Sequence, residues 1–168
     1  MENQISEEIL KDLDKVDALL KHIQGVQTNC IYLGKRLIRD GKNELGRILI
    51  ANSLKHDHSK FFGTEWDFLS KNDIDESDAI SLILRDQVIK QHNHTNPHHP
   101  EYWGGVKNMP SVYIAEMVCD WKARSSEFGS DLVNWIEEVA TKRFEFDMED
   151  EVGEKIKYYL SLLIEKSF

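Results

Sequence analysis

Apolar residues recur three and four positions apart along most of the chain, a pattern that predicts a series of amphipathic helices. The first stripe starts at Ile9, with Ser6 as the expected N-cap, and runs to the charged last turn and glycine of residues 39–41. Gly25 is the position at which this helix would break or kink. The polar residues 71–78 are expected to form a loop. Further helices are expected over residues 43–57, 79–92, 107–124, 132–144 and 152–163.

These elements predict an all-α fold in one domain that spans residues 1–168. The length is typical of a single domain and is enough to bury a sizeable core. Cys30 and Cys119 fall on apolar helical faces without the close spacing of thiolate metal sites, so both are interpreted as reduced core thiols. The N-terminus is acidic, and no apolar run approaches the roughly 18 residues that a membrane span needs. We therefore expect a soluble, cytoplasmic protein with no membrane partner.

Two polar residues follow the apolar part of the run at residues 47–61. If one helix continues through this run, Leu49 shares a face with His56, and Ile50 shares a face with Asp57. Both polar side chains would then point into the interior. A buried imidazole and a buried carboxylate are costly unless a partner satisfies them, and a bound cation satisfies both. The pair therefore predicts a metal site.

Two more polar residues lie on apolar helical faces elsewhere in the chain. His22 has Leu19 three residues before it and Val26 four residues after it, a setting in which a histidine is more often a core residue than a ligand. Asp120 shares a helical face with Glu116 and is expected to point inward. A metal ligand explains a buried aspartate better than packing does, because the uncompensated charge would be costly.

The most unusual segment is residues 92–105, where four of the seven histidines fall within eight residues. Two prolines prevent a helix from continuing, so we expect an ordered loop of the kind that often carries binding residues. His92 ends an apolar helical face and is the best candidate ligand here, whereas His94 would point away. Neighbours in an extended chain point to opposite sides, so only one of His98 and His99 is expected to reach a metal.

These motifs, in their order along the chain, resemble those of the HD superfamily of metal-dependent phosphohydrolases. The shared features are a helical histidine, a His-Asp pair with a lysine three residues on, and a later helical aspartate. The His-rich loop is similar to one in the two-metal branch of that superfamily, but the Gly-Tyr-Pro ending of the branch that acts on cyclic dinucleotides is absent. The residues that carry the resemblance are His22, His56, Asp57, Lys60 and Asp120.

The resemblance implies an HD-type helical bundle around one divalent transition metal, with a second ion possible. Nitrogen and oxygen ligands with open positions suit Mn, Fe, Co or Ni, and also Mg, better than a closed structural zinc site. Asp57 is the natural bridge between two ions because a carboxylate has two oxygens. The candidate ligands are His22, His56, Asp57, Asp120, His92, His98 and His99.

Four further residues are candidates for catalysis. Lys60, Lys122 and Arg124 are expected to hold a phosphate. Glu65 is interpreted either as a carboxylate that positions a water or as an early helix residue. His58 lies about 200° around a helix from His56, so it is expected at the surface or behind the ligands.

Charge limits the partners of the protein. Lys and Arg total 21 and Asp and Glu total 30, which gives a formal net charge of −9 and argues against a surface that grips DNA or RNA. A bound cation reverses the charge locally, so a small anionic substrate remains compatible. We expect a metal-dependent phosphohydrolase that acts on a small phosphoester, with nucleotides favoured by the resemblance alone.

Three other functions remain open. A di-iron oxygenase of the HD type would carry two irons and consume oxygen. A non-catalytic metal-binding module would hold metal tightly without turnover. A helical interaction protein would contain no metal at all.

Overall fold

The computed structural model describes residues 7–71 and 78–164, and within these ranges the chain forms helices and turns but no strand. The predicted all-α fold is therefore confirmed. The expected N-cap Ser6 and most of the expected loop, residues 72–77, lie outside the described residues. The helices are α1 (Glu7–Arg39), α2 (Asn43–Ser53), α3 (Gly63–Glu65), α4 (Ala79–Thr95), α5 (Ser111–Phe128), α6 (Leu132–Trp135), α7 (Thr141–Phe144) and α8 (Glu151–Ile164). Short 3-10 or π turns are η1 (His58–Phe61), η2 (Trp66–Lys71), η3 (Pro100–Trp103), η4 (Val106–Asn108) and η5 (Ile136–Ala140).

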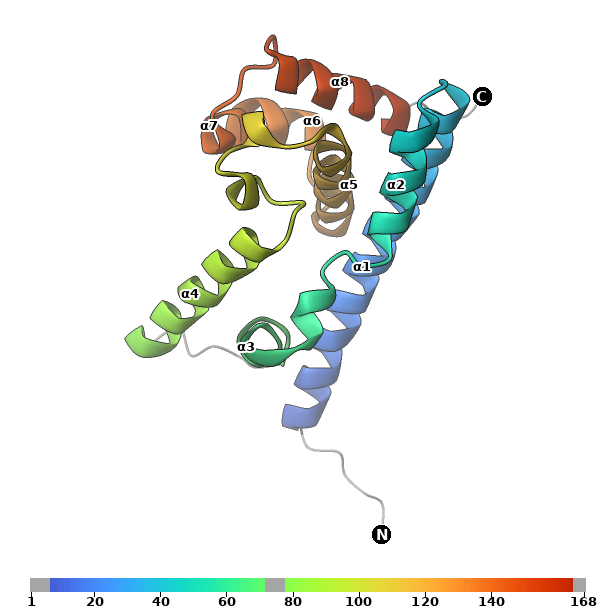
Figure 1. Ribbon diagram of the computed structural model, residues 1–168. Helices are drawn as coiled ribbons and strands as arrows, with labels where there is room; N and C mark the ends of the chain where they lie inside the picture. The colour runs from blue at the N-terminus through green and yellow to red at the C-terminus, as the bar shows by residue number, and fades with distance from the viewer. Residues whose placement is uncertain (1–6, 72–77, 165–168) are drawn as a thin grey trace.

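Helix α5 is the central element (Figure 1). The long helix α1 and its antiparallel neighbour α2 pack against one side of α5, and α8 crosses at one end of the bundle. The buried apolar cluster draws on all four helices, with Leu33, Leu49, Val118 and Ile156 fully buried. Such burial of aliphatic side chains is the main favourable contribution to folding. Helix α4 stands apart from the others and meets the rest of the fold mainly at its C-terminal end (Figure 1).

Two glycines allow α1 and α2 to approach closely. A Cβ placed on Gly46 would lie 2.4 Å from the backbone oxygen of Gly34, which is too close for any side chain. A Cβ on Gly34 would lie 2.6 Å from a side-chain carbon of Ile50. This close packing fixes the start of the segment that carries His56 and Asp57.

Two expectations about helix ends and breaks are wrong. Helix α1 continues unbroken through Gly25, which lies against Ala123 of α5, where a Cβ would sit at 3.4 Å. Helix α2 ends at Ser53 and does not continue to Asp57. Tight turns follow, in which the amide of His56 donates to the oxygen of Ser53.

The other predicted helices are present. Asp78 caps α4, because its side chain accepts hydrogen bonds from the amides of Ile80 and Ser81. The helix expected over residues 132–144 is a continuous helical stretch made of α6, η5 and α7. Cys30 and Cys119 are buried free thiols, as expected. Over the part of the chain that the structure describes, no helix combines the length and the apolar character that a membrane crossing requires.

Candidate metal centre

Side chains from four separate segments meet at the end of the bundle where α1, α5 and the turn after α2 come together. His22 of α1 and Asp120 of α5 face each other, with the His22 Nε2 atom 3.2 Å from Asp120 Oδ1. His56 and Asp57 reach the same place from the turn. His22, His56 and Asp120 each offer one ligand atom, and these atoms lie within 4.8 Å of one another.

The backbone at Asp57 explains how both members of the His-Asp pair point inward. Neighbouring residues on an α-helix point about 100° apart. Instead, the chain leaves the helix and Asp57 adopts a left-handed conformation, with φ 55° and ψ 16°. Aspartate tolerates this conformation better than most residues, and such conformations are concentrated at functional sites. As a result His56 and Asp57 are 3% and 1% exposed, although Leu54 just before them is 70% exposed.

A second group of histidines lies on the other side of Asp57. His92 comes from the last turn of α4, and His98 and His99 come from the loop that follows it. Ligand atoms of these three histidines also lie within 4.8 Å of one another. The loop is anchored by Asn96, whose side-chain amide donates to Ser59 Oγ at 3.1 Å and to the backbone oxygen of His92 at 3.0 Å.

The expectation that His98 and His99 point to opposite sides does not match the structure. Their ring centroids are 4.3 Å apart, and both rings contact His92, at 5.9 Å and 4.9 Å. The pair sits at a tight turn, where the amide of His99 donates to the oxygen of Asn96, and Pro100 begins a 3-10 turn. The alternation of an extended strand therefore does not apply to these two residues.

Asp57 stands between the two groups. Its Oδ2 atom faces the first group, 3.6 Å from His22 Nε2 and 3.8 Å from His56 Nε2. Its Oδ1 atom faces the second group, 3.2 Å from His92 Nε2 and 3.4 Å from His98 Nε2. One carboxylate thus presents one oxygen to each group, which is the arrangement needed to bridge two cations.

Most of the atoms that point into this centre lack hydrogen bonds, the exception being Asp57 Oδ2, which accepts from Lys60 Nζ. Buried polar atoms are normally satisfied, and an unsatisfied one costs about 1–3 kcal/mol. Metal ions account for these atoms, because each atom has a lone pair and each group converges on one place. Within the described parts of the chain, the buried atoms without a hydrogen-bond partner include His22 Nε2, His56 Nε2, Asp57 Oδ1, His92 Nε2, His98 Nε2 and Asp120 Oδ1.

Carboxylates hold the far side of three of the rings. Glu127 Oε1 lies 2.7 Å from His22 Nδ1, and Glu116 Oε1 lies 3.1 Å from His56 Nδ1. When a carboxylate accepts a hydrogen bond from Nδ1, the Nε2 atom keeps its lone pair free for a metal.

Glu65 supports the third ring. Its Oε2 atom lies 2.7 Å from the Nδ1 atom of His92, and it also accepts a hydrogen bond from Ser59 Oγ at 2.8 Å. Glu65 is 5% exposed and lies in the first turn of α3, so the interpretation as an early helix residue is confirmed. Its carboxylate also orients the ring of His92, a role that neither sequence interpretation included.

A third possible ligand group, of His56, His98 and Glu116, is better explained as support. Glu116 contacts the Nδ1 atoms of the two histidines, at 3.1 Å and 3.9 Å. Their unsatisfied Nε2 atoms point the other way, toward Asp57. The Nε2 side is therefore the candidate ion side of these rings.

Electrostatics keep the two aspartates ionised. Burial by itself raises the pKa of Asp57, but the imidazoles of His92 and His98 and the Lys60 ammonium together hold this pKa well below its usual range. The Lys60 Nζ atom is 2.7 Å from Asp57 Oδ2. Burial also opposes ionisation of Asp120, yet the neighbouring His22 imidazole lowers the pKa of this carboxyl.

The histidines differ in how their surroundings act on them. Burial lowers the pKa of His98, and burial together with the neighbouring imidazoles lowers the pKa of His99 to about 2. Both rings are therefore neutral, which is the form that binds metals. Burial opposes protonation of His56 as well, but the hydrogen bond to Glu116 and the charge of Asp57 raise its pKa.

A cleft of about 850 Å³ opens onto the centre between α1, α4 and α5. Asp57, His92, His99 and Asp120 line it. Its walls also carry positive charge, from Lys15, Lys21, Lys60 and Arg124. The cleft thus joins the candidate ligands to groups that attract an anion.

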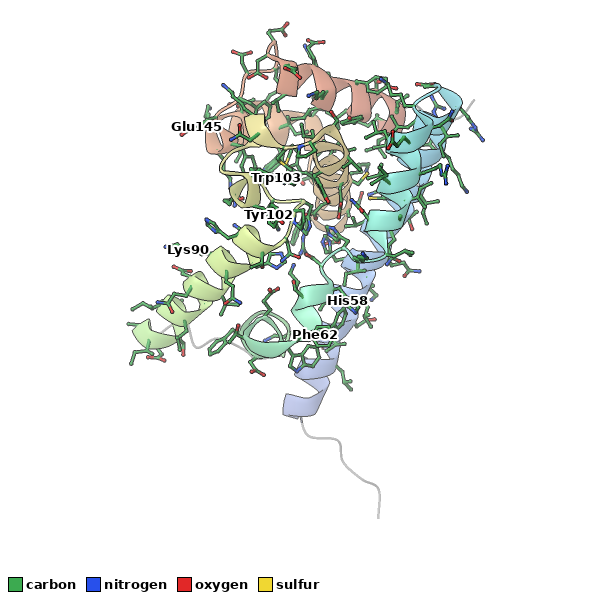
Figure 2. All side chains as sticks on the ribbon, viewed as in Figure 1. His58, Phe62, Lys90, Tyr102, Trp103 and Glu145 are labelled. Carbon is green, nitrogen blue, oxygen red and sulfur yellow. The ribbon has the colours of Figure 1, made fainter. Side chains whose placement is uncertain are left out.

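Not every predicted residue lies at this cleft. Lys122 does not line it, because two positions beyond Asp120 is about 200° around the helix, and its ammonium donates to Ser126 Oγ instead. Its predicted contact with a substrate phosphate is therefore wrong. His94 and His58 are exposed, as expected. Figure 2 shows His58 beside Phe62 on the turn next to α3, and both side chains are exposed.

Sequence reasoning missed Glu127 and underrated Glu116. Glu116 lies four residues before Asp120 and Glu127 seven residues after it, so all three carboxylates share one face of α5. That spacing could have identified them as one cluster. The pairing of Glu127 with a histidine 105 residues earlier in the chain could not have been found from spacing.

The chain belongs to a family of unknown function (DUF5662), which matches residues 11–162 and so covers the whole centre. No curated protein and no solved structure matches the chain.

Proposed function

We propose that this protein is a metal-dependent phosphohydrolase whose centre holds two divalent ions bridged by Asp57. The observation that carries the proposal is the position of the Asp57 carboxylate between two groups of unsatisfied imidazoles. A buried carboxylate surrounded by histidines has no comparable role in packing, because desolvation of the charge is costly. The resemblance to the HD superfamily supports the same function.

The donor set fits divalent transition metals. One ion would be held by His22, His56, Asp57 and Asp120, and the other by Asp57, His92, His98 and His99. Imidazole and carboxylate ligands suit Mn, Fe, Co and Ni, with Mg as a weaker fit to so many nitrogens. The ions would supply Lewis acidity, which polarises phosphoryl oxygens and makes water a better nucleophile.

The residues of the chain itself would bind and orient the substrate. Lys60 and Arg124 line the cleft and would attract the phosphoryl group of a small phosphoester. Glu65, Glu116 and Glu127 would keep the rings in place during the reaction. Nucleotides lead among such substrates by resemblance alone. A cytoplasmic setting, in which the two buried thiols stay reduced, is part of the proposal.

Phosphate release tests this function. Purified protein loaded with Mn²⁺ under argon should release inorganic phosphate from at least one member of a panel of p-nitrophenyl phosphate and nucleoside monophosphates. Asp120→Asn should abolish that release, because the amide retains the shape but loses the charge that holds an ion. Release without any divalent ion, or undiminished release by Asp120→Asn, would contradict the proposal.

The histidine-rich donor set also favours a second candidate, a di-iron oxygenase. Imidazole and carboxylate ligands with open positions are typical of non-haem iron. Iron-loaded protein would then consume dioxygen in the presence of its substrate and release no phosphate under argon. Tight metal binding without either reaction would identify a binding module instead.

A further inference from the structure

A second pocket, of about 290 Å³, lies beside the candidate metal centre between α5 and the α6–α7 segment. Aromatic side chains form much of its wall. The rings of Trp121 and Phe144 are nearly parallel, at 14° with centroids 5.7 Å apart, and Trp135 meets Trp121 edge-on at 5.2 Å. Aromatic walls of this kind favour a flat ring that can stack or meet them at an edge.

The pocket adjoins the cleft at the metal centre. His99, Trp121, Arg124 and Phe128 line both spaces. His99 is also one of the candidate ligands, so a molecule in the pocket lies next to the centre. One ligand can therefore place a head group near Asp57 and a ring among the aromatic side chains.

The charged side chains that line the pocket are both positive. Arg124 and Arg143 line it, and no carboxylate does so among the described residues. The Arg143 guanidinium carbon lies 5.0 Å from the Phe144 ring centroid. Guanidinium groups stack on aromatic rings and donate to oxygen or nitrogen atoms at a ring edge. A ring with hydrogen-bond acceptors along its edge fits better than an aliphatic chain.

We propose that this pocket is a subsite for the planar aromatic part of the substrate, whose phosphoryl group lies at Asp57. The inference rests on the proposed phosphohydrolase function, since it places the phosphoryl group at the metal centre. The substrate class is then a phosphoester of a flat ring system of one or two rings. Phosphoesters of small aliphatic alcohols leave the pocket unused and are poorer ligands.

Binding of two non-hydrolysable probes tests the subsite without relying on turnover. Methylphosphonate carries the head group alone, and naphthylmethylphosphonate adds a planar bicyclic ring. Calorimetric titration of the Mn²⁺-loaded full-length protein should give at least about tenfold tighter binding of the naphthyl probe, because the ring stacks on aromatic side chains.

Matched variants locate the ring. Phe128 is 76% exposed, so Phe128→Ala should leave the fold intact yet weaken binding of the naphthyl probe several-fold without changing binding of methylphosphonate. Phe62→Ala is the control, because Phe62 is 64% exposed and lies away from the pocket (Figure 2). Arg143→Ala should also weaken binding of the naphthyl probe. Lys142→Ala removes the adjacent exposed cation and should leave that binding unchanged.

The outcomes separate this inference from the proposed function. Equal affinities of the two probes, or equal effects of Phe128→Ala and Phe62→Ala on binding, overturn the subsite. If methylphosphonate binding still depends on metal in that case, the proposed metal centre stands. The naphthyl probe could also bind tightly without metal, in a way that depends on Phe128. That result supports the aromatic pocket but overturns its link to the metal centre. Failure of both probes to bind overturns both proposals.

Discussion

Glu65 provides a specific test of the second ion. Its carboxylate accepts from His92 Nδ1 at 2.7 Å and from Ser59 Oγ at 2.8 Å, and it lies on the side of His92 away from Asp57. The substitution Glu65→Gln keeps the size of the side chain and one acceptor oxygen but removes the charge. The ring of His92 should therefore remain close to its place while its Nε2 atom becomes a weaker ligand.

The expected magnitude follows from this geometry. Loss of a group that supports a ligating histidine typically lowers metal affinity about 10–100-fold, equivalent to about 1.4–2.7 kcal/mol. The retained amide oxygen places Glu65→Gln near the lower end, at about tenfold. The loss should fall on the ion held by His92, because Glu65 does not contact His22 or Asp120.

Calorimetric titration of the metal-free protein with Mn²⁺ resolves the effect. The wild-type protein should bind two ions per chain, and Glu65→Gln should weaken one binding step while leaving the other unchanged. Glu127→Gln should weaken the other step, because Glu127 supports His22. Glu138→Gln is the control, since Glu138 is exposed and its carboxylate pairs with Lys142 on the α6–α7 segment.

Two results would contradict this role of Glu65. If Glu65→Gln binds both ions with wild-type affinity, the carboxylate does not tune His92. If it weakens both steps equally, the two groups of histidines do not form separate ion sites.

Three further predictions concern metal occupancy and stability. Asp120→Asn should lose at least one ion per chain by elemental analysis while its circular dichroism stays helical. Asp150 accepts hydrogen bonds from the amides of Val152 and Gly153 at the start of α8, so Asp150→Ala should lower the free energy of unfolding by about 1 kcal/mol in urea titrations. Burial raises the pKa of Tyr159 to about 12, so the folded state keeps a proton that the unfolded state loses above about pH 10. The free energy of unfolding should therefore fall as pH rises from 10 to 12. In thermal melts, Tyr159→Phe should make that fall smaller.

The helices could be predicted because apolar periodicity reports which faces are buried. The end of α2 could not, since Leu54 continues the apolar pattern although it is 70% exposed. Whether a helix continues at such a point depends on tertiary contacts, here the inward turn of His56 and Asp57. The buried position of His56 and Asp57 was therefore predicted correctly, but through a wrong local geometry.

The candidate ligands could be predicted because their chemistry is unusual on apolar faces. Their grouping could not, because it depends on how α4 and its loop approach the turn that carries Asp57. The same limit applies to Glu65, whose partner His92 lies 27 residues later in the chain. Contacts of this kind follow from the assembled fold rather than from local spacing.

The most direct test of the account is the number of metal ions bound to each chain. Elemental analysis of the protein as purified, with no metal added, should find about two transition-metal ions per chain. Asp57→Asn should hold at most one, because both groups lose the carboxylate they share, and His92→Ala should hold one. A protein without bound metal, or with one ion per chain that His92→Ala leaves unchanged, would contradict a centre bridged by Asp57.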